Sequence, residues 1–186
     1  MKFYVIRHPL TESNVNKITQ GWADSPLIQE GINTAEKLGE YFLDKKITKI
    51  YSSDLGRCVQ TSNIVNKKLG LEIIKVKGLR EQNLGKYNGL PKSIIKQEFD
   101  EYDYSALPKE GERFLDMSKR VLDYIHSIDN EDNILIVTHT GCYQSILSYA
   151  LNEDLDSDKC KTSSLTTCLF ERKEDKIVLL KRTEIK

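Results

Sequence analysis

Basic side chains follow two apolar runs of this sequence at the points where the runs end. Arg7 and His8 end the run "KFYVIRH", and His139 ends the run "NILIVTH". A third segment, "KIYSSDLGR", contains two serines and reaches Arg57. If these runs are parallel strands of one sheet, their carboxyl ends lie at the same edge, where ligands of such sheets bind. Two of the three histidines and two arginines would then meet there.

This combination of residue types suits the binding and transfer of a phosphoryl dianion. The planar fork of arginine matches phosphate oxygens. A neutral imidazole can attack phosphorus, and a protonated second imidazole can stabilise the charge that develops. The reaction also needs a group that protonates the leaving oxygen and later activates water. Glu81 is the candidate, because it lies in "LREQNLGKYNG", a loop with two glycines after the third predicted strand.

Strand and helix patterns alternate along most of the chain. Apolar runs predict strands at 2–6, in "ITKIYSS", in "EIIKV" and in "NILIVTH", and helical spacing predicts helices at 29–43, 56–68, 114–128 and 141–151. The segments "SLTTCLFER" and "KIVLLKR" flank a polar tip and predict an antiparallel hairpin. We therefore expect an α/β protein, a three-layer αβα sandwich with a mostly parallel central sheet and this hairpin at its C-terminal edge. No linker or repeat interrupts the pattern, so residues 1–186 are predicted to form a single domain.

Two of these segments carry specific packing expectations. The run "NILIVTH" is continuously apolar and β-branched, which is typical of a central strand covered on both faces. The segment from Phe114 to Ile128 predicts a long amphipathic helix. We expect its inward face to be formed by Leu115, Leu122, Ile125 and Ile128.

Charge and composition exclude several classes of protein. The 186 residues carry 28 basic and 28 acidic side chains, so the chain lacks the excess positive charge that binds nucleic acid. The N-terminal apolar run is too short for a signal peptide, and no apolar stretch approaches the roughly 18 residues of a membrane span. The four cysteines form no CxxC pair and predict free thiols in the reducing cytoplasm. His139, Cys142 and Cys160 match no zinc spacing, so no metal is expected.

Four segments together resemble the histidine phosphatase superfamily, which includes the cofactor-dependent phosphoglycerate mutases. "RHPLTESN" resembles the family's RHGE(T/S)xxN signature, and "YSSDLGRCVQTS" resembles its SDLxRAxQTA segment. "LREQNLGKYNG" and "VTHTG" resemble its LxExxxGxWEG and VxHGG segments. The four occur in the family's order and span most of the chain. The resemblance implies a phosphoglycerate mutase-like fold, and the chain's length fits the family's small phosphatases, including those like α-ribazole phosphatase.

The resemblance implies a role for each side chain expected at the shared edge. His8 would be the nucleophile and form a phosphohistidine. Arg7, Arg57 and His139 would hold the phosphoryl group. Glu81 would donate and later accept the proton. No metal and no cofactor is implied.

Four further residues would bind the substrate on the same basis. Asn14 would contact a phosphate oxygen through its side-chain amide, with a turn or a helix cap as the alternative. Gln20 and Gly21, in "TQGWADSPL", match a substrate-contacting loop of the mutases, and a simple turn is the alternative. Thr140 would offer its backbone N–H at the start of a helix, where anions are favoured.

Three positions depart from the family's pattern: Pro9 and Thr140 replace glycines, and Tyr87 replaces a tryptophan. Pro9 tests the assignment most directly, because proline has no N–H and cannot adopt a positive φ. In the family a nearby backbone carbonyl holds the nucleophile's second ring nitrogen, and we expect Pro9 to supply that carbonyl to His8. We also expect a φ of about −65° at Pro9, with His8 facing His139.

The expected activity is that of a histidine acid phosphatase-type phosphomonoesterase acting on a small phosphorylated metabolite. The alternative is a cofactor-dependent phosphoglycerate mutase. The short step from "NLGKYNG" to "LPKEGERF" leaves little chain to exclude water from the site and favours hydrolysis. A phosphate-binding regulatory domain with weakened catalysis is a third interpretation, motivated only by Pro9 and Thr140. Sugar phosphates, phosphoglycerate, phosphoserine and nucleotide-like esters are all candidate substrates.

Overall fold

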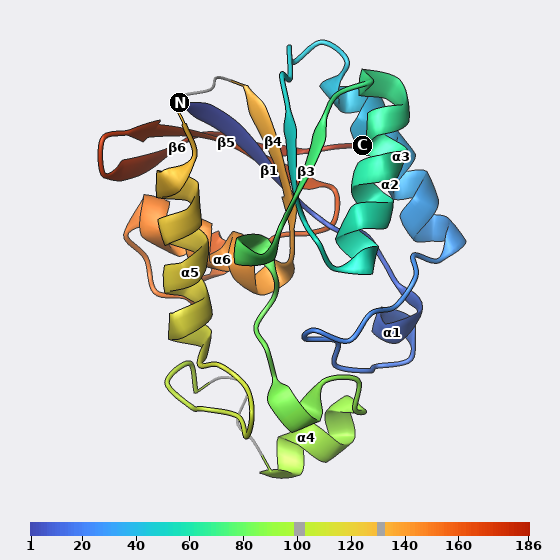
Figure 1. Cartoon of the computed structure of the whole chain (residues 1–186), viewed down its shortest axis with the longest axis vertical. Coiled ribbons are helices and arrows are strands. Elements are labelled where there is room, and N and C mark those ends of the chain that lie inside the picture. Colours follow the sequence, from blue (N-terminus) through green and yellow to red (C-terminus); the bar gives the residue numbers. More distant parts are fainter. Residues whose placement is uncertain (99–102, 130–132) are drawn as a thin grey trace.

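Figure 1 shows the computed structural model of the chain, which describes residues 1–98, 103–129 and 133–186. Within these residues, six strands form one mixed sheet in the order β3-β2-β4-β1-β5-β6. The strands are β1 (Lys2–Arg7), β2 (Ile50–Ser53), β3 (Ile73–Val76), β4 (Ile134–Thr138), β5 (Thr166–Lys173) and β6 (Lys176–Glu184). The α-helices are α1 (Glu12–Val15), α2 (Gln29–Phe42), α3 (Gly56–Leu69), α4 (Lys92–Glu98), α5 (Phe114–Ser127) and α6 (Thr140–Leu151). Short 3-10 helices are η1 (Lys77–Leu79), η2 (Gly85–Tyr87) and η3 (Asp158–Cys160).

The sheet is parallel at its centre and antiparallel at its C-terminal edge. β1 pairs in parallel with β4, which places Arg7 opposite Thr138, and β2 pairs in parallel with both β4 and β3. β5 runs antiparallel to β1, and β6 runs antiparallel to β5. The predicted fold class, including the C-terminal edge hairpin, is therefore confirmed.

Helices cover both faces of the sheet, α2 and α3 on one side and α5 and α6 on the other (Figure 1). β4 shows why its sequence is continuously apolar. Ile134 and Ile136 belong to the core under α5 and α6, whereas Leu135 and Val137 belong to the core under α2 and α3. All four side chains are fully buried. Successive side chains of a strand point to opposite faces, so a central strand between two helical layers needs apolar residues at every position.

The buried stripe of α5 differs in part from the predicted one. Buried side chains recur at intervals of three and four residues: Phe114, Met117, Val121, Ile125 and Ile128. Leu115 is 50% exposed, so the expectation that it faces the core is wrong. The stripe begins one residue earlier, at Phe114, and successive helical residues point in directions roughly 100° apart. Leu122 is partly buried against the core, while Ile125 and Ile128 are buried as predicted.

The carboxyl ends of β1, β2 and β4 all point toward the part of the protein that contains α1 and α4 (Figure 1). An isolated antiparallel bridge between Ile18 and Pro91 joins the segments that follow α1 and precede α4. Within the described residues, every helix is too short or too polar to cross a membrane.

Gly31, in the first turns of α2, packs directly against the chain that leaves β1. The backbone N–H of Ile28 donates to the carbonyl of Leu10 at 3.1 Å. A Cβ at Gly31 would lie 2.2 Å from that same carbonyl oxygen. Leu10 is two residues beyond His8, so this close approach links helix packing to the place where the chain carrying His8 leaves the sheet.

We expect Gly31→Ala to lower the free energy of unfolding by about 1–3 kcal/mol, because the new methyl group meets backbone rather than a movable side chain. This loss should outweigh the better helix propensity of alanine, worth about 1 kcal/mol. Urea unfolding monitored by circular dichroism measures the change. Lys37→Ala, on the exposed face of the same helix, should leave the midpoint unchanged. An unchanged midpoint for Gly31→Ala would show that the Leu10 backbone moves aside freely.

Candidate active site

A cavity of about 590 Å³ lies where the carboxyl ends of β1 and β4 meet the loops from α1 and α4. All the residues predicted for the site line this cavity except His139, which is fully buried beside His8. Further lining residues, which the sequence did not identify, are Lys92, Phe114, Gln144, Asp156 and Lys161. These belong to no motif and come from distant parts of the chain, so only the tertiary fold brings them together.

Both ring nitrogens of His8 have partners. Its Nδ1 lies 2.9 Å from the carbonyl oxygen of Pro9, and its Nε2 lies 3.2 Å from the Nε of Arg57. A carbonyl can only accept and an arginine can only donate, so these partners assign the proton to Nδ1 and leave a lone pair on Nε2. His8 is therefore a neutral imidazole with Nε2 available as a nucleophile.

The contact with the Pro9 carbonyl is the one expected from the sequence, and it is confirmed. Pro9 is not among the described residues with a positive φ, so proline meets no conformational conflict at this position. The rings of His8 and His139 lie with their centroids 5.3 Å apart and their planes at 64°. Proline at this position is therefore compatible with a His8 ring that faces His139.

Burial and two neighbouring cations hold the pKa of His8 well below its ordinary value. Burial is the largest cause, followed by the positive charges of Arg57 and Arg7. The hydrogen bond to Pro9 raises the pKa but is the weakest of these influences. The ring is thus neutral at pH 7, the form that nucleophilic attack requires.

Arg57 is 1% exposed, and the turn before α2 holds its guanidinium. Its terminal nitrogens donate to the carbonyls of Ala23 at 2.9 Å and Gly21 at 2.8 Å, and a carboxylate oxygen of Asp24 lies 3.6 Å away. Gly21 has a φ of +50°, and a Cβ there would lie 2.1 Å from the side chain of Asn88. The turn interpretation of Gly21 is therefore correct, and this turn both holds Arg57 and forms part of the cavity wall.

Arg7 brings a second guanidinium to the cavity. Burial lowers its pKa, and the negative charge of Glu81 acts in the opposite direction. It remains cationic, because the ordinary pKa of arginine is far above 7. Within the described residues, its buried Nε has no hydrogen-bond partner. Leaving a buried donor without a partner is costly, and an anion bound in the cavity would supply the acceptor.

His139 is fully buried and contacts a serine that the sequence did not identify as its partner. The Oγ of Ser53 lies 2.8 Å from its Nε2, and the Sγ of Cys58 lies 3.4 Å from the same atom. Burial, followed by the charge of Arg57, holds the pKa of His139 well below its ordinary value. His139 is therefore neutral here, and a phosphoryl dianion beside it would favour protonation. Ser53 could not be identified as its partner because the sequence carries no signal that β2 pairs with β4.

The carboxylate of Glu81 faces the start of α6. Its Oε2 accepts from the backbone N–H of Gly141 at 3.1 Å, and its Oε1 accepts from that of Gln82 at 3.1 Å. A Cβ at Gly141 would lie 2.4 Å from Oε1, so this glycine leaves room for the carboxylate. Thr140 is the first residue of α6 and lines the same cavity. The proton-transfer candidate and a helix N-terminus, which favours anions, therefore share one wall.

Asn14 and Gln20 complete the predicted set. Asn14 completes the capping box of α1, whose N-cap is Thr11: its Oδ1 accepts from the backbone N–H of Thr11 at 3.1 Å and from the Thr11 hydroxyl at 3.0 Å. The cap interpretation is therefore correct, and the amide NH₂ is the group of Asn14 suited to a phosphate oxygen. The Oε1 of Gln20 is buried and has no hydrogen-bond partner within the described residues.

The sequence of this chain is similar to those of known proteins. A family model described as "Histidine phosphatase superfamily (branch 1)" matches residues 3–184. Broad-specificity phosphatase YOR283W of Saccharomyces cerevisiae is 31% identical over 170 residues, which cover 86% of this chain and 74% of that protein. Probable phosphoglycerate mutase GpmB of Yersinia pestis is 30% identical over 161 residues, which cover 79% of this chain and 74% of that protein.

Solved structures show the same similarity in three dimensions. Bacillus stearothermophilus YhfR matches with a TM-score of 0.86 and 28% identity, over 96% of this chain and 95% of that one. The alpha-ribazole phosphatase from Shigella flexneri matches with a TM-score of 0.82 and 25% identity, over 96% of this chain and 94% of that one.

The lowered pKa values of His8 and His139 predict that acid destabilises the fold. An unfolded histidine has a pKa of about 6.5, so below this pH the unfolded chain binds more protons than the folded one. Stability is therefore retained above this pH and lost as the pH falls further, by up to about 1.4 kcal/mol per pH unit for each histidine.

Urea unfolding at a series of values between about pH 7 and pH 5 measures this dependence. His139→Gln should reduce its slope, because one buried site is removed. His126→Gln, which alters the histidine on α5 outside the described cavity, is the control for the loss of a histidine. A His139→Gln slope equal to that of the unaltered protein would contradict the assignment.

Proposed function

The chain belongs to the histidine phosphatase superfamily, and on that premise we propose that it hydrolyses the phosphomonoester of a small metabolite through a phosphohistidine at His8. The observation that carries this proposal is the lone pair on Nε2 of His8, held beside two arginines by the Pro9 carbonyl and the Nε of Arg57. We place the enzyme in the cytoplasm, where its buried free cysteines would stay reduced.

In the first step, Nε2 of His8 attacks the phosphorus atom and the bond between phosphorus and the ester oxygen breaks. Glu81, in its protonated form, gives its proton to the leaving oxygen, so that an alcohol departs. The Nε–H of Arg57, which the structure directs at Nε2, would turn to a phosphoryl oxygen as the new bond forms. Charge-assisted hydrogen bonds from Arg57 and Arg7 would stabilise the negative charge on the three equatorial oxygens of the transition state.

In the second step, water attacks the phosphohistidine from the side that the alcohol has left. The Glu81 carboxylate removes a proton from this water, the bond between phosphorus and nitrogen breaks, and inorganic phosphate leaves. His8 regains its lone pair and Glu81 regains its proton, so both groups return to their starting states. A single carboxylate can serve both steps because the alcohol and the water occupy the same position in turn.

We expect His8→Asn to lower the turnover of p-nitrophenyl phosphate by about a thousandfold or more, because the covalent route is lost. A labelled phosphate on the unaltered enzyme should be stable to base and labile to acid, as expected of a phosphorus–nitrogen bond. His126→Asn is the matched control, because this histidine is not among the residues that line the described cavity.

Full turnover by His8→Asn would contradict the role of His8. If the unaltered chain binds phosphate but turns over no ester, the third interpretation, a phosphate-binding regulatory domain, is favoured instead.

A mutase is the second candidate, because the relative named GpmB is described as a probable phosphoglycerate mutase. Phosphorus NMR of 3-phosphoglycerate with catalytic 2,3-bisphosphoglycerate separates the two activities. We expect inorganic phosphate to form faster than 2-phosphoglycerate. Rapid equilibration of the two phosphoglycerates before any phosphate appears would establish the mutase instead.

A further inference from the structure

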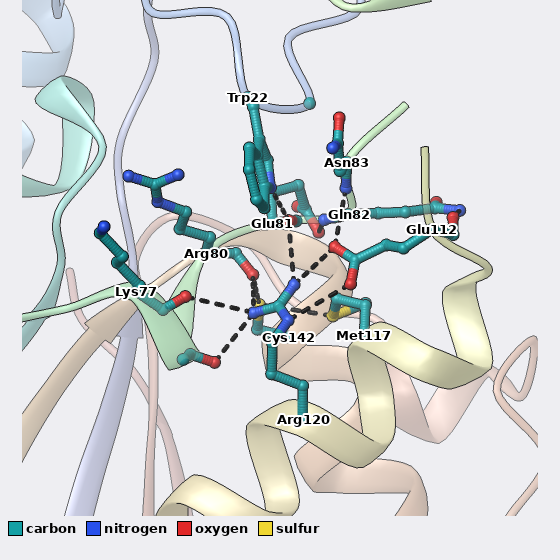
Figure 2. A network of polar contacts seen from close by, with 12 residues as sticks. Trp22, Lys77, Arg80, Glu81, Gln82, Asn83, Glu112, Met117, Arg120 and Cys142 are labelled. Carbon is teal, nitrogen blue, oxygen red and sulfur yellow. Dashed lines mark hydrogen bonds and ion pairs between the residues drawn. The ribbon is translucent and has the colours of Figure 1, made fainter. Parts of the chain in front are cut away.

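Arg120, on α5, and Glu112, just before that helix, form a polar cluster behind Glu81 (Figure 2). We propose that this pair positions the backbone around Glu81, so that its carboxylate can deliver a proton to the leaving oxygen. This inference rests on the proposed phosphatase reaction and adds two positioning residues to it. Neither Arg120 nor Glu112 is among the residues that line the described cavity, so neither is expected to touch the substrate.

Arg120 binds the chain on the N-terminal side of Glu81. Its Nη1 donates to the carbonyls of Gly78 at 3.0 Å, Arg80 at 3.1 Å and Lys77 at 3.4 Å. Its Nη2 donates to the carbonyl of Glu81 itself at 3.4 Å. A single guanidinium therefore donates hydrogen bonds to carbonyls of η1 and of the segment that leads to Glu81. Figure 2 shows these groups around Arg120.

Glu112 binds the chain on the C-terminal side of Glu81. Its Oε1 accepts from the backbone N–H of Asn83 at 2.9 Å, and its own backbone N–H donates to the carbonyl of Asn83 at 2.9 Å. Its carbonyl accepts from the side-chain amide of Gln82 at 3.0 Å. The same Oε1 accepts from Nη2 of Arg120 at 2.6 Å. The ion pair thus joins both flanks of Glu81 into one unit.

Trp22 supplies a further contact to the same peptide. Its indole N–H donates to the carbonyl of Glu81 at 2.7 Å, so this oxygen is shared with Arg120. The guanidinium of Arg80 lies 4.6 Å from the centre of the Trp22 ring and forms two hydrogen bonds with Asp54, at 2.7 and 2.6 Å. Fixing the Glu81 backbone fixes the point from which its side chain extends, and the N–H groups of Gln82 and Gly141 then hold the carboxylate at the start of α6.

The geometry of this cluster requires an arginine. Its planar fork carries five donors and serves several carbonyls and a carboxylate at once, whereas lysine offers three donors at one point. The side chains of Arg120 and Glu112 are 26% and 21% exposed, and ion pairs near the surface add little to global stability. We therefore expect the pair to affect the position of Glu81 more than the global stability. A displacement of a catalytic group by about 1 Å lowers the reaction rate about a hundredfold.

Two esters with different leaving groups can distinguish a variant that delivers the proton poorly from a variant that folds poorly. Nitrophenolate leaves p-nitrophenyl phosphate without a proton, whereas the alkoxide of glycerol phosphate needs one. Release of the alcohol in the first turnover, with enzyme in excess, measures phosphoryl transfer to His8 apart from the later hydrolysis. The variants are Arg120→Ala, Arg120→Lys and Glu112→Gln. Lys119→Ala is the matched control, because Lys119 is an exposed neighbour on α5 that pairs with Asp123.

We expect Arg120→Ala to slow the first turnover of glycerol phosphate about a hundredfold and that of p-nitrophenyl phosphate less than about fivefold. Arg120→Lys and Glu112→Gln should show the same preference for the aryl ester, with smaller losses, and Lys119→Ala should match the unaltered protein. In a protein that already carries Glu81→Gln, Arg120→Ala should lower the rate of the first turnover by less than about threefold further, because the carboxylate that Arg120 positions is already absent.

Equal losses on the two esters, or full additivity with Glu81→Gln, would overturn the positioning role. If Arg120→Ala does not fold, as judged by its thermal unfolding, the same comparison with Arg120→Lys and Glu112→Gln decides. Failure of the proposed function is distinguishable, because the unaltered protein would then hydrolyse neither ester, or Glu81→Gln itself would not discriminate between them.

Discussion

The central constraint on this protein is that Arg57 must stay buried and cationic beside a neutral histidine. A buried charge without partners is strongly disfavoured, and the surrounding chain is arranged to supply them. Carbonyls of the turn at Gly21 and Ala23 accept from the guanidinium, and Asp24 lies nearby. Asp24 also accepts from the backbone N–H of Gly56 at 2.6 Å. The turn that receives Arg57 and the helix that carries it are therefore held together as one unit.

The orientation of His8 depends on a backbone carbonyl rather than on a side chain or an N–H. Position 9 therefore has to present its oxygen to Nδ1, and proline does this at 2.9 Å. A glycine at this position would add conformational freedom that the observed contact does not use. The departure from the family's pattern that looked most disruptive in the sequence is thus compatible with the tautomer that leaves Nε2 unprotonated.

The sequence predicts the strands and their shared edge well, because Arg7, His8 and His139 lie at or directly after the ends of buried runs. It also predicts the two-sided burial of β4, since four consecutive apolar residues fit only a covered strand. The order of strands is not encoded locally, so the contact of Ser53 with His139 could not be anticipated. The exposure of Leu115 was missed because shifting a helical stripe by one residue changes which side chains face inward. Arg120 was missed because all its partners except Glu112 are backbone carbonyls, which any sequence supplies.

In the proposed reaction, phosphoryl binding and proton transfer would be supported by different parts of the fold. The phosphoryl clamp comes from β1, the start of α3 and the turn at Gly21, whereas Glu81 follows η1 and is held from α5. The cavity wall also includes Lys92, Tyr104 and Lys161, which belong to neither support. Substitutions on that wall can change which alcohol fits without disturbing the clamp or the proton donor. This separation offers a physical reason why relatives about 30% identical to this chain include both a broad-specificity phosphatase and a probable mutase.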